Sequence, residues 1–256
     1  THAYIMGSFS GAVCMPSRAM LMTGQYLQKL DKVQGAIGEN IKTMPQLLKE
    51  SGYTTFFTGK WHNRKASFFK SFTNGENIFL MGGNGNHLKV PLYNFDPSGI
   101  YPEKNKFFKD KFSSVLFKEA AVNFLREYDG IKPFFACVSF TSPHDPRMAP
   151  DDYKKKYNSE AISLPKNFMS KHNFDNGELI IRDENLLPFP RTENAVKEEI
   201  AAYYAMISEV DDNIGKILKV LEETGHSDNT IIIFTSDNGL AVGQHGLLGK
   251  QNLYEH

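Results

Sequence analysis

The 256-residue sequence contains 29 basic and 29 acidic side chains, so its formal net charge is zero. This balance argues against binding to nucleic acid or to a membrane surface through bulk charge, and it leaves anion recognition to a few locally placed cations. Two cysteines do not make a disulfide framework, and the apolar runs are too short to span a bilayer.

The first segment with chemical content is Cys14-Met15-Pro16-Ser17-Arg18, which continues to Leu21-Met22-Thr23-Gly24. Proline favours the first turn of a helix, so Cys14 is expected at a helix N-terminus, where free N–H groups and the helix dipole attract anions. Arg18 adds a positive charge one turn into this helix, on the same face. The pattern predicts a nucleophile beside an anion site, and a buried structural thiol is the alternative.

A short helix is predicted over 43–52, from a threonine cap, an early proline and a closing glycine. The β-forming run 53–58 predicts a buried strand. Lys60 and His62 follow, and they share a face if the strand continues. A lysine and a histidine at a strand end are suited to hold an anion and to transfer a proton. The alternative is a solvated lysine and an ordinary loop histidine.

The apolar run 133–140 predicts a strand buried on both faces, with Cys137 as part of the core. Two prolines then bracket His144. This histidine therefore follows the carboxyl end of a strand, where open α/β sheets bind ligands. Asp145 and Arg147 come next, either as residues that face the substrate or as a local ion pair.

The longest predicted helix starts near Thr192 and ends at Gly225, because apolar residues recur every three or four positions between them. The β-branched run 230–236 predicts a further strand, which leads to Asp237 and Asn238. A carboxylate and an amide oxygen are hard ligands of the kind that calcium prefers. An Asn-Gly turn is the alternative.

The segment 243–250 combines three glycines, which permit close backbone approach, with His245 and Lys250. Taken alone, it would be a flexible surface loop with a solvated lysine. The neighbouring motifs are therefore needed before the lysine can be assigned to a site.

The predicted strands near 53–58, 133–140 and 230–236 alternate with helices, including one over 113–125. This alternation indicates an α/β fold with a parallel or mixed sheet. No shift in composition marks a linker, so residues 1–256 are expected to form one domain.

Taken in order, these segments resemble the signature elements of the type I sulfatases, a family of the alkaline-phosphatase-like superfamily. The matching elements are C-x-P-S-R with L-x-T-G, G-K-W-H, S-P-H, D-N-G and G-x-H-G-x-x-G-K, and they span nearly the whole chain. The resemblance implies a three-layer α/β/α sandwich with a mostly parallel central sheet, incomplete at both ends. It also implies hydrolysis of a sulfate monoester carried by a carbohydrate.

The resemblance further implies a role for each matching residue. Cys14 would be converted by a formylglycine-generating maturation enzyme to formylglycine, whose hydrate is the nucleophile. Lys60 and Lys250 would contact the sulfate. His62 would contact the formylglycine hydroxyl, and His144 would protonate the leaving alcohol. The remaining matches are Arg18 as a further cation, His245 as a second candidate for the acid, and Asp237 and Asn238 as ligands of a calcium ion.

Sulfatases usually begin with a strand that ends in an Asp-Asp pair, which supplies two more calcium ligands, and they continue beyond Tyr254-Glu255. This sequence has no such strand before Cys14. Asp151-Asp152 and Asp211-Asp212 are poor substitutes, because both pairs are expected to face solvent. The chain is therefore expected to be an internal fragment of the catalytic domain of a longer enzyme, which by resemblance would be periplasmic or secreted.

Two other functions stay open. One is a phosphomonoesterase, phosphodiesterase or phosphonate hydrolase of the same superfamily, in which the histidines would bind zinc instead of moving protons. The other is an inactive fragment, or a homologue that binds sulfated glycans without hydrolysing them.

Overall fold

The computed structural model describes residues 14–30, 35–83, 85–175, 177, 179–252 and 254. In this part of the chain, three parallel strands form a sheet of order β2-β1-β3. No helix within it is both long and apolar enough to cross a membrane. The strands are β1 (Thr54–Lys60), β2 (Asn74–Phe79) and β3 (Phe134–Ser139). The α-helices are α1 (Cys14–Thr23), α2 (Leu27–Leu30), α3 (Met44–Glu50), α4 (Lys65–Ser71), α5 (Ser113–Glu127), α6 (Asp151–Lys154) and α7 (Glu193–Glu223). Short 3₁₀ turns lie at Glu103–Asn105, Ser159–Ala161, Arg182–Leu186 and Ser227–Asn229.

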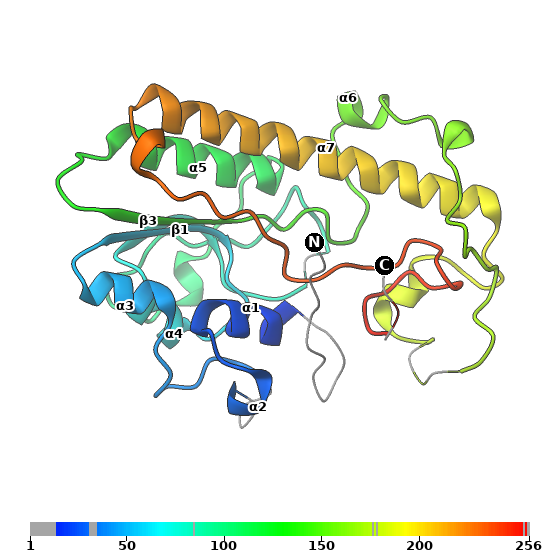
Figure 1. Cartoon of the computed structure of the whole chain (residues 1–256), viewed down its shortest axis with the longest axis horizontal. Helices are drawn as coiled ribbons and strands as arrows, with labels where there is room; N and C mark the ends of the chain where they lie inside the picture. Colours follow the sequence, from blue (N-terminus) through cyan, green and yellow to red (C-terminus); the bar gives the residue numbers. More distant parts are fainter. Residues whose placement is uncertain are drawn as a thin grey trace.

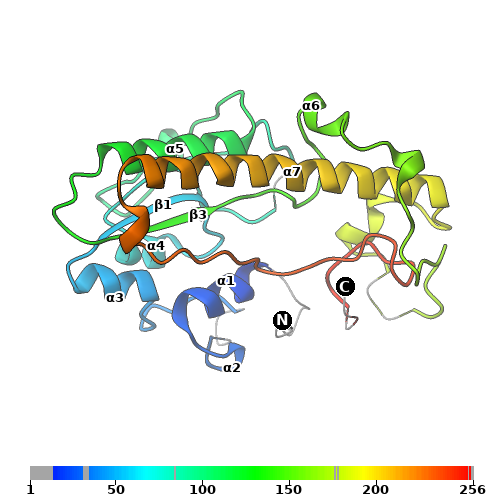
Figure 2. The same ribbon diagram turned by 45° about the horizontal axis from the view of Figure 1, so that its top comes forward.

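Helices cover both faces of the sheet, with α5 and α7 on one side and α1, α3 and α4 on the other (Figures 1 and 2). Consecutive residues of β1 explain this arrangement, because successive side chains of a strand point to opposite faces. The ring of Phe56 stacks on Phe124 of α5 at 4.4 Å. The ring of Phe57 packs on the other face, edge-on against Trp61 and Phe68. A strand that is apolar on both faces is typical of a parallel sheet between helical layers, and the predicted α/β/α architecture is confirmed.

Several predicted elements are confirmed with their capping residues. The helix predicted over 43–52 is α3, and the hydroxyl of Thr43 accepts a hydrogen bond from the Gln46 N–H at 3.1 Å. The predicted long helix is α7, where the hydroxyl of Thr192 accepts from the Ala195 N–H at 3.2 Å. Gly225 follows the last turn with a φ of +74°, the left-handed conformation that glycine adopts without strain.

The predicted strand over 230–236 is wrong. These residues are extended, but they form no ladder with the described strands, and they connect the end of α7 to the C-terminal loops (Figure 1). Ile231 and Phe234 are 90% and 81% exposed. A β-branched run reports only a preference for extended backbone, whereas a strand also needs a partner for its N–H and C=O groups.

Candidate active site

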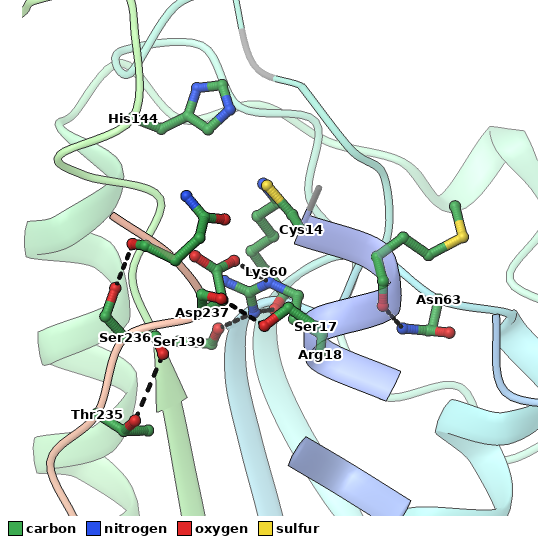
Figure 3. A network of polar contacts seen from close by, with 12 residues as sticks. Cys14, Ser17, Arg18, Lys60, Asn63, Ser139, His144, Thr235, Ser236 and Asp237 are labelled. Carbon is green, nitrogen blue, oxygen red and sulfur yellow. Dashed lines mark hydrogen bonds and ion pairs between the residues drawn. The ribbon is translucent and has the colours of Figure 1, made fainter. Parts of the chain in front are cut away.

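The first helix places Cys14 over the carboxyl ends of two strands. Cys14 is the first residue of α1 and only 5% of its surface is exposed. Lys60 is the last residue of β1, and Ser139 is the last residue of β3. Figure 3 shows Lys60 reaching from the end of β1 to the thiol of Cys14, with the loop of His144 on the other side. The nucleophile candidate therefore lies at the edge of the sheet where α/β proteins bind ligands.

Arg18 ties three segments of the chain together below Cys14. Its Nε donates to Asp237 Oδ2 at 2.9 Å, and one terminal nitrogen donates to the carbonyl of Lys60 at 2.6 Å and to Ser139 Oγ at 2.5 Å. Ser17 donates to the carbonyl of Asp237 as well. Because these bonds join α1 to β1, to β3 and to the segment after α7, Arg18 fixes the floor of the site in addition to supplying charge.

Cationic and imidazole groups surround the sulfur of Cys14. Burial alone would raise the pKa of this thiol, but hydrogen bonds from His144 and His62 and the charge of Lys60 lower it to about 4. Lys250 Nζ lies 3.7 Å from the sulfur and 3.5 Å from His144 Nε2. Position 14 therefore lies among groups that favour a negative charge.

The two histidines beside Cys14 are held in different electrostatic environments. For His62, burial and the nearby charge of Lys60 lower the pKa, although the contact with Cys14 partly opposes them. For His144, burial also lowers the pKa, but hydrogen bonds with Asp145 and Cys14 outweigh it and raise the pKa above its ordinary value. His144 Nδ1 lies 3.1 Å from the carboxylate of Asp145 and 2.8 Å from its carbonyl oxygen. His62 is thus suited to be neutral and His144 to be protonated.

The loop of His144 rests on a further histidine, His87, which is fully buried. Nε2 of His87 lies 2.9 Å from the carbonyl of His144, and Nδ1 lies 3.2 Å from Thr141 Oγ1. His87 comes from a region whose sequence has no sustained period, so no signal identified it. Ser139 was missed too, although its place at the end of a predicted strand was a usable signal.

Asp145 and Arg147 do not form the local ion pair that was one of two predictions for them. Asp145 contacts His144, whereas Arg147 Nε lies 3.3 Å from Glu199 Oε2 of α7. A terminal nitrogen of Arg147 also donates to the carbonyl of Pro143 at 3.1 Å. Arg147 thereby fixes the loop of His144 to α7, and Asp145 orients the imidazole.

The side-chain oxygens of the two predicted metal ligands, Asp237 and Asn238, differ in whether they have a partner in the described part of the protein. One carboxylate oxygen of Asp237 is paired with Arg18. Asn238 donates to the carbonyl of Gly239 at 2.9 Å, but its own Oδ1 is buried and accepts no hydrogen bond from the described residues. A buried carbonyl oxygen without a donor is the kind of group that a bound cation would satisfy. Within the described ranges, no three His, Cys, Asp or Glu side chains cluster as a metal site.

His245 is placed apart from the other candidates. Its ring stacks on Tyr254 at 3.9 Å, and its Nε2 lies 3.0 Å from Asn167 Nδ2. None of its contacts among the described residues joins it to Cys14, so His144 is the better candidate for the acid. The neighbouring Lys250 does reach the site, because the loop between them turns back toward α1.

The sulfatase family model matches residues 3–256. An N-acetylglucosamine-6-O-sulfatase of Bacteroides thetaiotaomicron is 26% identical over 99% of this chain and 54% of its own length. A protein solved in complex with its substrate D-glucosamine-2-N,6-O-disulfate superposes with a TM-score of 0.72 at 21% identity, covering 97% of this chain and 60% of the other. The phosphonate monoester hydrolase of Agrobacterium radiobacter superposes with a TM-score of 0.69 at 19% identity, covering 96% and 57%. The chain spans about half the length of the curated relatives it matches. This chain, with its signature elements in order along the sequence, belongs to the sulfatase family.

Proposed function

We propose that this chain supplies the nucleophile and the anion-binding residues of an enzyme that hydrolyses a sulfate monoester of a carbohydrate. The observation that carries the proposal is the convergence of four other segments of the chain on the segment of Cys14 and Arg18. A cysteine in a strongly cationic, partly dehydrated site is suited to chemistry on an anionic ester. The converging side chains are Cys14, Arg18, Lys60, His62, His144, Asp237 and Lys250.

Two lysines would stabilise the charge of the transferring sulfuryl group. Lys60 is only 3% exposed, and Lys250 Nζ lies 3.7 Å from the position of the nucleophile. In a buried site these charges interact with an anion more strongly than they would in water, and they need no rearrangement during the reaction. Arg18 already neutralises Asp237, so its main contribution would be to hold the site together.

Cys14 would be the residue that a formylglycine-generating enzyme modifies. Formylglycine supplies, as its hydrate, an oxygen nucleophile at the place where the thiol now lies. The chain prepares this position with the N-terminus of α1 and the cations around it, which favour negative charge on the attacking atom.

The histidines would divide the proton transfers between them. His62, whose pKa is lowered, would remove a proton from the hydroxyl at position 14. His144, whose pKa is raised, would donate a proton to the departing alcohol oxygen. Conversion of Cys14 removes the thiol contacts of both rings, but the hydrogen bond between His144 and Asp145 is independent of it. Each positioned proton transfer contributes about 10²–10⁴-fold to the rate.

Asp237 and Asn238 would hold part of a calcium site. A bound calcium ion would polarise a sulfate oxygen as a Lewis acid. The unpaired Oδ1 of Asn238 fits such an ion, and two ligands would be only a part of the six to eight that calcium takes. Calorimetric titration with calcium should therefore show weaker binding for Asn238→Ala than for the unmodified protein, independently of any turnover.

The proposal is tested on protein produced together with a formylglycine-generating enzyme. Mass spectrometry of the intact protein would establish conversion of Cys14, and parallel assays on sulfated sugars, nitrophenyl sulfate and nitrophenyl phosphate would define the ester class. Turnover of a sulfate ester that disappears in Cys14→Ala and persists in Cys137→Ala is expected. Faster turnover of phosphate or phosphonate esters than of sulfate esters would favour a phosphoesterase or phosphonate hydrolase of the same superfamily. Calorimetric binding of a sulfated sugar without turnover would favour a glycan-binding protein.

A further inference from the structure

A buried ion pair lies behind the loop that carries Lys250. The carboxylate of Glu184 and the guanidinium of Arg191 are 2.6 Å apart, and the two residues are only 3% and 2% exposed. Dehydrating both charges is costly, and it is offset only when the remaining hydrogen-bonding positions of each group are filled. The partners that fill them therefore indicate what the pair holds in place.

Those partners are backbone groups of the loop that precedes Lys250. Glu184 accepts hydrogen bonds from the N–H of Leu248 at 2.9 Å and from the N–H of Gly249 at 2.7 Å. Arg191 donates to the carbonyl of Gly246 and, at 2.9 Å, to that of Glu184 itself. Three of the four residues before Lys250 are thus held by one ion pair.

Gly249 makes this close approach possible. A Cβ added at this position would lie 2.7 Å from Glu184 Oε1 and 3.2 Å from Asp183 Cβ. Any side chain here would push the carboxylate away from the loop. The glycine that precedes Lys250 in the signature segment therefore has a physical purpose, which is to seat the backbone on Glu184.

The held loop delivers the ammonium of Lys250 to a narrow position. Its Nζ lies 3.7 Å from Cys14 Sγ, 3.5 Å from His144 Nε2 and 3.8 Å from Asp183 Oδ2. Asp183 adjoins Glu184 in sequence, so the same turn that supports the loop also provides a carboxylate beside the ammonium. A lysine side chain has four rotatable bonds, and fixing its backbone and its charge limits where the ammonium can go.

We propose that Glu184 and Arg191 are positioning residues for Lys250, and that they act on the site only through this lysine. The inference rests on the proposed sulfatase activity, because Lys250 is assigned there to the transferring sulfuryl group. Neither residue of the pair contacts Cys14 or His144 in the described part of the chain. Their effect on catalysis should therefore depend on the presence of Lys250.

A double-mutant cycle on kcat/KM for the best sulfate ester tests this dependence. Glu184→Gln leaves one backbone N–H without a carboxylate oxygen and should lower kcat/KM by about tenfold or more, within the range of coupling between contacting groups. In the Lys250→Ala background the same substitution should lower it by less than about threefold. If Glu184→Gln lowers kcat/KM by the same factor with and without Lys250, the proposal would be overturned.

A second substitution and a control separate positioning from general loss of structure. Arg191→Lys keeps the charge but replaces two separate donor nitrogens with one, so the contacts with Gly246 and Glu184 cannot both keep their geometry. It should show the same dependence on Lys250. The control is Glu209→Gln, because Glu209 is equally buried and accepts hydrogen bonds at 2.6 and 2.7 Å on α7, away from this loop. Glu209→Gln is expected to lower kcat/KM by the same factor whether or not Lys250 is present.

A readout without turnover keeps this proposal distinct from the proposed function. In protein made without the maturation enzyme, Lys250→Ala removes a cation 3.7 Å from the sulfur, so the pKa of the Cys14 thiol should rise. Glu184→Gln should raise it in the same direction and add nothing to Lys250→Ala; independent, additive rises would overturn the positioning role. If the enzyme without substitutions turns over no sulfate ester, the proposed function fails, while this titration still decides whether Glu184 acts through Lys250.

Discussion

Replacing Gly59 with alanine should destabilise the protein and disrupt the site at once. Gly59 pairs with Ser139 across β1 and β3, and its φ is +101°. A Cβ built there would lie 2.0 Å from the carbonyl oxygen of Ser139 and 2.7 Å from its carbonyl carbon. Both atoms belong to backbone, so one strand must move away from the other.

The expected loss of stability has two parts. An L-residue at this φ costs on the order of 1–3 kcal/mol of backbone strain. Forced displacement in a packed sheet costs about 1–3 kcal/mol more. Gly52→Ala is the matched control, because Gly52 has a φ of +92° and nothing lies within 4 Å of the place that an added Cβ would take. The control should therefore lose only the strain energy.

Urea unfolding of both variants, with the m-value checked for constancy, gives the two free energies of unfolding. The difference between Gly59→Ala and Gly52→Ala should be about 1–3 kcal/mol, which is the cost of the close contact alone. Equal losses for the two glycines would refute the reasoning, because the contact with Ser139 would then have no energetic consequence.

Further predictions concern the groups around position 14. Without the maturation enzyme, the thiolate absorbance of Cys14 should persist on acidification until near its pKa of about 4, and Cys14→Ala should abolish it. Asp145→Asn removes a contact that raises the pKa of His144, so the alkaline limb of the kcat/KM profile should move to lower pH; an unmoved limb would exclude His144 as the acid. Gly82→Ala would place a Cβ 2.4 Å from His62 Nε2, and kcat should fall by about 10²–10⁴-fold with the circular dichroism spectrum unchanged.

The sequence was sufficient to predict where Cys14, Lys60 and His144 lie in the fold, because each lies beside a strong local signal. Cys14 precedes a helix, Lys60 ends a β-forming run and His144 follows one. The long helix α7 was equally clear from its period and its threonine cap. These features depend on interactions between residues that are close in sequence, so a local sequence pattern predicts them.

The elements that sequence reasoning missed depend on partners far along the chain. The strand β2 contains Asn74, Gly75 and Glu76, which disfavour strands, yet it pairs with the central strand β1. The opposite error occurred at 230–236, where strongly β-forming residues have no described strand as a partner. In both cases pairing outweighed the local preference.

The supporting side chains of the site were hidden for a related reason. Glu184 and Arg191 bind backbone N–H and C=O groups of a distant loop. Every residue type except proline offers both groups, so such contacts leave no motif at either end. His87, whose Nε2 contacts the carbonyl of His144, is a further example.

The candidate active site joins positions that are far apart in the chain, and this has a practical consequence. Arg18 and Asp237 are separated by 219 positions, and Cys14 and Lys250 by 236. A small anion bound beside Cys14 and Lys250 would connect segments that are 236 positions apart in this chain. Its binding energy would add to the global free energy of unfolding by mass action. Because sulfate also stabilises folded proteins in general, occupancy of the site would be reported by a rise in melting temperature with sulfate concentration that is larger for the unmodified protein than for Lys250→Ala.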